Sequence, residues 1–121
     1  MGYELPALRS AELFIDTDYT EFIPGIEEAR TGDIIFLTRD GQTDPRLFHV
    51  GVLSFDEEGE LYLNHNARHV GFARKEKLEE AMEDPRHAVN AGIKRPIVEN
   101  PYGQHTYFLV TYGLEHLVIT I

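Results

Sequence analysis

Cysteine is missing from all 121 residues. Its absence excludes disulfides, thiolate metal sites and thiol-based catalysis, and it leaves the redox compartment undetermined. Long apolar runs are missing too, since none approaches the ~20 residues that a helix needs to cross a bilayer. The opening MGYELPALRS lacks the charged start and apolar stretch of a signal peptide. The sequence as it stands predicts a cytoplasmic protein, and the alternative is an exported domain whose Met-Gly start is left by trimming.

Positive charge is scarce as well. Eleven Lys and Arg stand against 21 Asp and Glu, which gives a formal net charge of -10 at pH 7. The carboxylates are spread along the chain and would repel nucleic acid and an anionic membrane, so we expect neither as a partner. Basic residues gather only between Arg68 and Lys77, where interleaved glutamates indicate a solvated helix face with ordinary ion pairs.

The length and the 42% hydrophobic content suit one compact core, so we predict a single domain over residues 1–121. Short β-branched or aromatic runs between turn residues predict strands at 34–37, 48–55, 60–65, 93–98, 106–111 and 117–121. Helical spacing predicts short helices at 7–15 and 75–83. We therefore predict an α+β fold, with a mostly antiparallel sheet of five to six strands and one or two helices packed on one face.

The clearest local signal is a β-hairpin, because the runs 48–55 and 60–65 flank an acidic turn that contains Gly59. If the loop is 55–59, His49 lies directly opposite His65, and one imidazole could act as a base that the other orients. A four-residue loop instead pairs His49 with Asn66 and moves the histidines to different faces. The alternative interpretation is two structural polar residues at a sheet margin.

The remaining histidines carry weaker signals. His65 and His69 are spaced for one helix face and, with His49 and a carboxylate such as Asp33, would make an acceptable zinc set. We expect strand and turn there, however, and predict neither a metal nor another cofactor. Three histidines fall in predicted loops without a partner pattern, and we interpret them as structural: His87, His105 and His116.

Three short motifs follow one another along the chain: TGDIIFL at 31–37, HVGVL at 49–53 and LNHNA at 63–67. They resemble successive landmarks of the NlpC/P60 superfamily of papain-like cell-wall peptidases and amidases, and the spacing is most similar to the N-acetylmuramoyl-L-alanine amidase-like branch. The resemblance covers about the middle half of the chain. It implies a papain-like core, a bacterial peptidoglycan peptide as ligand, His49 as catalytic base and His65 as the residue that orients it.

The same resemblance exposes a departure. Members of the superfamily place a nucleophilic Cys at the start of a helix upstream of the Gly-Asp strand, and this chain has none. Ser10 could replace that Cys only if 7–15 is the corresponding helix, and a serine hydroxyl is much harder to deprotonate than a thiol. The Gly32-Asp33 pair would be structural, since it starts the core strand.

Three functions follow, in this order of preference. The first is a pseudoenzyme that binds a peptide or muropeptide-like ligand in a groove beside His49 and His65. The candidate ligand-binding residues there are Asn64, Asn66 and Arg68. The second is a peptidoglycan amidase or peptidase that uses a non-Cys nucleophile or a His-bound metal. The third is a structural or interaction domain, joined through an edge strand at 117–121. The oligomeric state stays open, as does a Cys supplied by a missing segment or partner.

Overall fold

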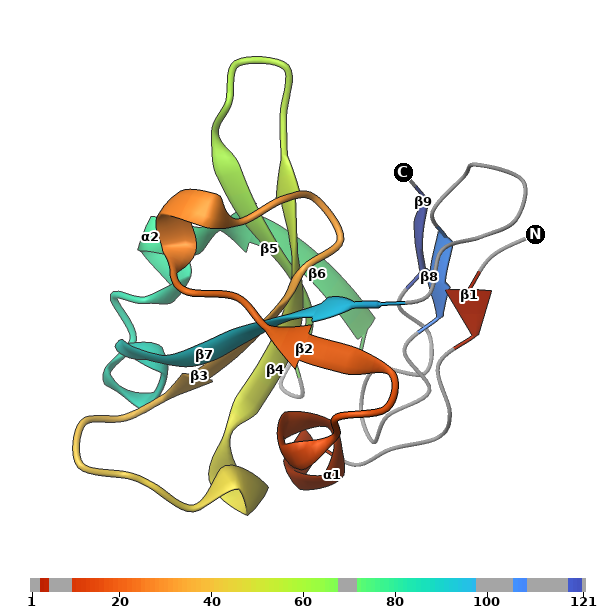
Figure 1. Ribbon diagram of the computed structural model, residues 1–121. Coiled ribbons are helices and arrows are strands. Elements are labelled where there is room, and N and C mark those ends of the chain that lie inside the picture. Colours follow the sequence, from red (N-terminus) through yellow and green to blue (C-terminus); the bar gives the residue numbers. More distant parts are fainter. Residues whose placement is uncertain (1–2, 5–9, 68–71, 98–105, 109–117, 121) are drawn as a thin grey trace.

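The computed structural model describes residues 3–4, 10–67, 72–97, 106–108 and 118–120 (Figure 1). Its main feature is a six-stranded antiparallel sheet in the order β2-β7-β3-β4-β5-β6. These strands are β2 (Thr20–Phe22), β3 (Ile34–Thr38), β4 (His49–Phe55), β5 (Leu61–Ala67), β6 (Phe72–Lys77) and β7 (Val89–Pro96). A second sheet, in the order β1-β8-β9, contains β1 (Tyr3–Glu4), β8 (Thr106–Phe108) and β9 (Val118–Thr120). The predicted α+β class and antiparallel sheet are confirmed.

Short helices and 3-10 turns connect the strands. They are α1 (Ser10–Ile15), η1 (Ile26–Glu28), η2 (Pro45–Leu47), α2 (Leu78–Ala81) and η3 (Pro85–His87). The helix predicted over 7–15 is present from Ser10 onward, and positions 7–9 lie outside the described residues. The helix predicted over 75–83 is wrong in its first part, because residues 72–77 form β6. Among the described residues no helix is long and apolar enough to cross a membrane.

Two predicted strands join a different sheet from the one expected. The runs at 106–111 and 117–121 contribute β8 and β9 to the second sheet, instead of extending the first. The edges of the large sheet are β2 and β6, and the sequence reasoning missed both. β2 has only three residues, and β6 reads FARKEK, which is too polar to show an apolar alternation.

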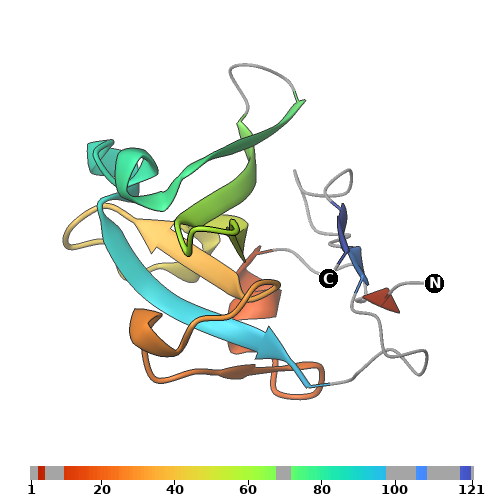
Figure 2. The ribbon, with the colours of Figure 1, turned by 90° about the horizontal axis from the view of Figure 1, so that it is seen from above.

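Both faces of the large sheet carry an apolar core, because successive side chains along a strand point to opposite faces. The first core lies under α1 and contains Leu13, Ile34, Phe36, Val50 and Val52. The second lies under α2 and contains Ile35, Leu37, Leu53, Leu63, Leu78, Ala81 and Ile93. The two helices therefore cover opposite faces, with β3 between them (Figure 2). The prediction that the helices pack on one face is wrong.

A buried lysine on the first face caps the C-terminal end of α1. Lys94 of β7 is fully buried, and its ammonium donates to the carbonyls of Leu13 (2.9 Å), Phe14 (3.1 Å) and Asp16. The ammonium also lies 4.8 Å from the ring centroid of Phe22. Because α1 has no basic residue in its own last turn, Lys94 supplies the cation that a helix C-terminus favours.

A buried ion pair anchors the start of β3. The Asp33 carboxylate accepts hydrogen bonds from Nε (2.9 Å) and Nη2 (2.8 Å) of Arg95 and from the backbone N–H of Arg30 (2.8 Å). Gly32 precedes it with a φ of 98°, a conformation that glycine adopts without strain. The pair joins β3 to β7 and η1, which agrees with the structural role expected for Gly32 and Asp33.

Candidate functional site

The hairpin of β4 and β5 positions the two candidate histidines. Gly51 pairs with His65 and Phe55 pairs with Leu61, so the loop spans 56–60 instead of 55–59. The prediction that His49 lies directly opposite His65 is therefore wrong, since the partner of His65 is two residues further along β4. Because the register differs by an even number of residues, the two histidines nevertheless share one face.

Gly51 makes room for His65 to reach His49. Gly51 lies directly opposite His65 on the neighbouring strand, and it is two residues from His49 on the same face of β4. A Cβ at position 51 would lie 2.3 Å from Cδ1 of Leu63, 3.1 Å from the carbonyl oxygen of Asn64 and 3.2 Å from Cβ of His65. The His-Val-Gly motif thus has a packing reason in this chain: a side chain at its third position would push β5 away.

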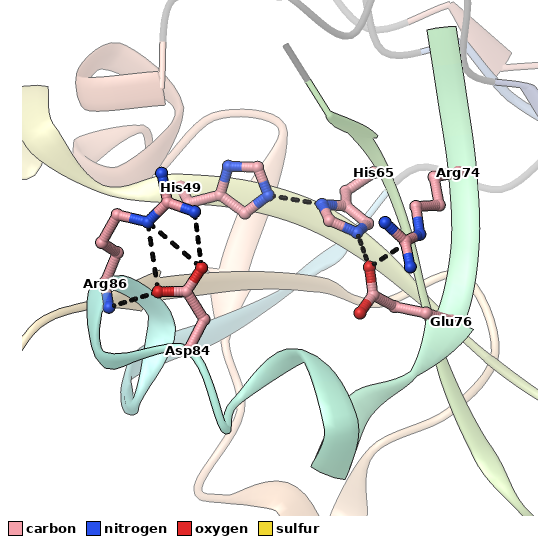
Figure 3. Close-up of polar contacts among 6 residues, drawn as sticks. All are labelled: His49, His65, Arg74, Glu76, Asp84 and Arg86. Atoms are coloured by element: carbon pink, nitrogen blue, oxygen red, sulfur yellow. Dashed lines mark hydrogen bonds and ion pairs between the residues drawn. The ribbon is translucent and has the colours of Figure 1, made fainter. Parts of the chain in front are cut away.

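His49, His65 and Glu76 form a continuous hydrogen-bonded chain, which we call the histidine relay (Figure 3). Nε2 of His49 lies 2.6 Å from Nδ1 of His65, and Nε2 of His65 lies 2.8 Å from Oε2 of Glu76. Glu76 comes from β6, and Nε of Arg74 is 3.3 Å from the same carboxylate oxygen. His65 is only 4% exposed, so its two ring nitrogens are satisfied inside the protein.

The carboxylate of the relay determines the tautomers of both rings. An ionised Glu76 only accepts hydrogen bonds, so Nε2 of His65 carries a hydrogen. In neutral His65, Nδ1 is then the acceptor, and Nε2 of His49 must donate to it. The basic lone pair of the His49 ring accordingly lies on Nδ1. Such an arrangement can orient His49 as a base and stabilise the imidazolium that forms when it takes a proton.

A third histidine, His87, packs against the ring of His49. His87 of η3 stacks on His49, with ring centroids 4.3 Å apart and an angle of 19° between the planes. Burial lowers the pKa of His87 from its ordinary value of 6.5; Asp84 and Glu76 oppose this change, whereas Arg86 and His65 add to it. His87 is therefore neutral near pH 7. The purely structural interpretation of His87 overlooked this contact with the candidate base.

Of the candidate ligand-binding residues, Asn64 is the one whose side chain lies within the described part of the structure. The Asn64 side chain donates to the carbonyl of Val52 (3.0 Å) and to Oγ of Ser54 (2.8 Å), which ties β5 to β4. Alternation along β5 directs it to the face opposite His65. Asn66 lies in β5, and Arg68 lies outside the described residues.

The zinc set considered from the sequence does not assemble in the described part of the chain. Within these residues no group of three or more His, Asp or Glu side chains is arranged to hold a metal ion. Asp33 is bound by Arg95, and His69 falls in an undescribed range, as do His105 and His116.

Helix α1 gives no support to a serine nucleophile. Leu13 packs in one cluster with Val50 and Val52, which alternate along β4 with His49. The helix that begins at Ser10 is thus packed on the face opposite the relay.

Two residues of the site were missed from the sequence: Glu76 and His87. Glu76 falls in the stretch interpreted as a helix face, and the polar β6 gave no alternation to correct that. A signal for His87 was available, because Asp-Pro-Arg occurs twice, at 44–46 before the candidate base and at 84–86 before His87.

Comparisons with known proteins add no relative. No protein-family model matches the chain, and neither the curated proteins nor the solved structures give a significant match. The resemblance to the NlpC/P60 superfamily thus rests on the three motifs alone and stays a prediction.

Proposed function

We propose that the protein is a pseudoenzyme of the NlpC/P60 type, which binds a peptide or muropeptide-like ligand beside His49 and His65 without cleaving it. The observation that carries this proposal is a complete histidine relay in a chain without cysteine. Burying His65 is unfavourable unless both ring nitrogens are hydrogen-bonded, and Glu76 and His49 meet that requirement. An oriented imidazole without a thiolate is suited to ligand binding.

The surroundings of the relay suit a ligand with amide and carboxylate groups. His49 is partly exposed, and Arg86 precedes His87, whose ring stacks on that of His49. The side chains of Arg74 and Arg86 are 47% and 75% exposed, and their guanidinium groups pair with Glu76 and Asp84. Guanidinium groups bind carboxylates, and an imidazole can donate to or accept from a peptide amide. Muropeptides carry both groups.

Hydrolysis is the second candidate, and the relay also favours it. A carboxylate-oriented imidazole is what a general base requires, so His49 could activate a non-cysteine nucleophile or a metal-bound water. The third candidate is an interaction domain without a ligand at this face.

Titration of the isotope-labelled chain with defined muropeptides, followed by NMR, tests the proposal, and mass spectrometry of the same samples detects cleavage. We expect saturable shifts of the His49 and Gly51 signals and an unchanged ligand mass. Cleavage would establish the hydrolase instead, and its sensitivity to a chelator would separate a metal-bound water from a nucleophile. Absence of binding would remove the ligand and leave the interaction domain, which predicts a concentration-dependent mass.

The variant His49→Gln should abolish the saturable shifts, because glutamine cannot reproduce the ring and its bond to His65. Lys77→Gln is the matched control: the Lys77 side chain on the neighbouring β6 is 42% exposed and forms an ion pair with Glu60, at 3.5 Å. Equal loss of binding in both variants would show that the ligand does not use the relay.

A further inference from the structure

The stacked His87 is the part of the site that the proposed function does not use. We propose that His87 is a proton-operated cover: neutral, it stacks on His49, and protonated, it leaves that ring and moves η3 off the sheet face. The value of such a cover to ligand binding rests on the proposed function, whereas the movement itself does not.

The charges around the stack disfavour a second cation. Across the sheet, His87 faces His49 on β4, His65 on β5 and Glu76 on β6. The two imidazoles of the relay are hydrogen-bonded to each other, and a single carboxylate, Glu76, is bonded to them. A protonated His87 would lie face to face with the His49 ring at 4.3 Å, and positive charge on the neighbouring His65 or Arg86 disfavours it.

Two carboxylates near His87, Asp84 and Glu76, favour its protonated form, but burial of the ring outweighs them and its pKa is lowered. Glu76 is bound by His65 and Arg74. On the turn itself, Asp84 forms a two-point ion pair with Arg86, with Nη2 at 2.6 Å and Nε at 3.1 Å. Arg86 also brings a positive charge to the same turn. Protonated His87 is therefore better solvated by water than held in the stack.

The turn can move as a unit at little cost. η3 contains no buried residue, so its departure from the sheet exposes little apolar surface. Its internal bonds stay intact, since Asp84 accepts from the Arg86 N–H (2.9 Å) and its carbonyl accepts from the His87 N–H (2.8 Å). Hydrogen bonds from Arg86 hold the pKa of Asp84 far below its usual range, so this cap remains ionised while His87 titrates.

The chain contains a natural counterpart without the titrating ring. η2 repeats the turn with Asp44, Pro45 and Arg46, and with the same carboxylate bonds to the Arg46 N–H (3.0 Å) and Nη2 (2.7 Å). Leu47 occupies the position that corresponds to His87 and is 61% exposed. The variant His87→Leu therefore gives η3 a sequence that the protein already folds into this turn.

The test is an NMR titration of the wild-type chain without ligand between about pH 7.5 and about pH 4.5, where histidines change charge. The imidazole signals of His87 report its protonation, and ring-to-ring NOEs between His87 and His49 report the stack. We expect these NOEs to disappear with the same midpoint as the His87 titration, below its ordinary 6.5. NOEs that persist after His87 is protonated would overturn the proposal.

Two variants identify the residue that causes the opening. In His87→Leu, we expect NOEs between the introduced leucine side chain and His49 to persist to the acid end of the titration. In Leu47→His, we expect a new histidine that titrates near its ordinary value and leaves the His49 signals unchanged. Opening that occurs equally in His87→Leu would assign the movement to the relay and refute the role of His87. Because no ligand is present, failure here is distinct from failure of muropeptide binding.

Discussion

The two faces of the large sheet bury different kinds of charged group. Under α1, Lys94 places an ammonium among three backbone carbonyls, which are acceptors that never titrate. Under α2, His65 links His49 to Glu76 through ring nitrogens that can exchange roles. The first arrangement binds the end of a helix and joins it to the sheet, whereas the second couples the tautomers of two imidazole rings.

The comparison indicates that the α1 face of the sheet contributes mainly to stability, whereas the α2 face carries the groups that can exchange protons. Burial lowers the pKa of Lys94, with Asp16 opposing the change, and the carbonyl contacts hold the cation in place. Substitutions on the α1 face should therefore act on the free energy of unfolding. Substitutions in the relay and its cover should act mainly on the protonation and position of the histidines.

The largest effect is expected for Lys94→Met on the α1 face. It leaves three carbonyls without their donor, and losing a charged group from a buried network typically costs about 3 kcal/mol or more. Denaturant unfolding measures the loss. The exposed Lys77→Met should change the unfolding free energy by less than about 0.5 kcal/mol. Comparable values for the two variants would show that Lys94 does not support α1.

Gly51→Ala should have the next largest effect and tests the α2 face. The new Cβ meets Leu63 and the backbone of Asn64, and such overpacking costs about 1–3 kcal/mol. We also expect the coupling across the His49–His65 hydrogen bond to weaken in NMR spectra, because Leu63 and the neighbouring atoms of β5, including Cβ of His65, must shift. Gly59→Ala is the control: its φ is 82° and nothing lies within 4 Å, so it should lose stability without altering the histidine signals.

Prediction from sequence succeeded where the residue pattern was local and apolar. The buried run of β3 and the two strands of the hairpin were assigned correctly, because β-branched runs between turn residues have few alternatives. The shared face of His49 and His65 followed from that hairpin. Their exact pairing did not, because the acidic turn fits more than one loop length.

The rest of the site depended on contacts that local patterns do not encode. Glu76 reaches His65 only because a polar strand forms the edge of the sheet, and its sequence FARKEK looks like a helix surface. His87 reaches His49 only because α2 and η3 fold back over the sheet after β6. Both contacts join different elements of the fold, so they depend on the tertiary arrangement.

Glu76→Gln should have a smaller effect on stability and a specific effect on the relay. Replacing the carboxylate weakens one hydrogen bond to a charged group, which is worth about 1.5–3 kcal/mol at most. A glutamine can donate as well as accept, so it no longer dictates which nitrogen of His65 carries the hydrogen. Imidazole nitrogen shifts should show mixed tautomers for His65 and His49. Unchanged tautomers would mean that Glu76 does not orient the relay.

The smallest effect is expected for the pH dependence that His87 contributes. Its pKa is lower in the folded protein than the ordinary 6.5, so below that value the unfolded chain binds the proton first. The free energy of unfolding should therefore fall as the pH drops through and below 6.5, and level off below the folded pKa. His87→Leu should flatten this part of the curve, whereas Leu47→His, which adds an exposed histidine, should leave it unchanged. Denaturant unfolding at a series of pH values measures the slope. An equally steep slope in His87→Leu would show that the stacked ring is not what destabilises the protein in acid, and would assign that sensitivity to the relay on the same face.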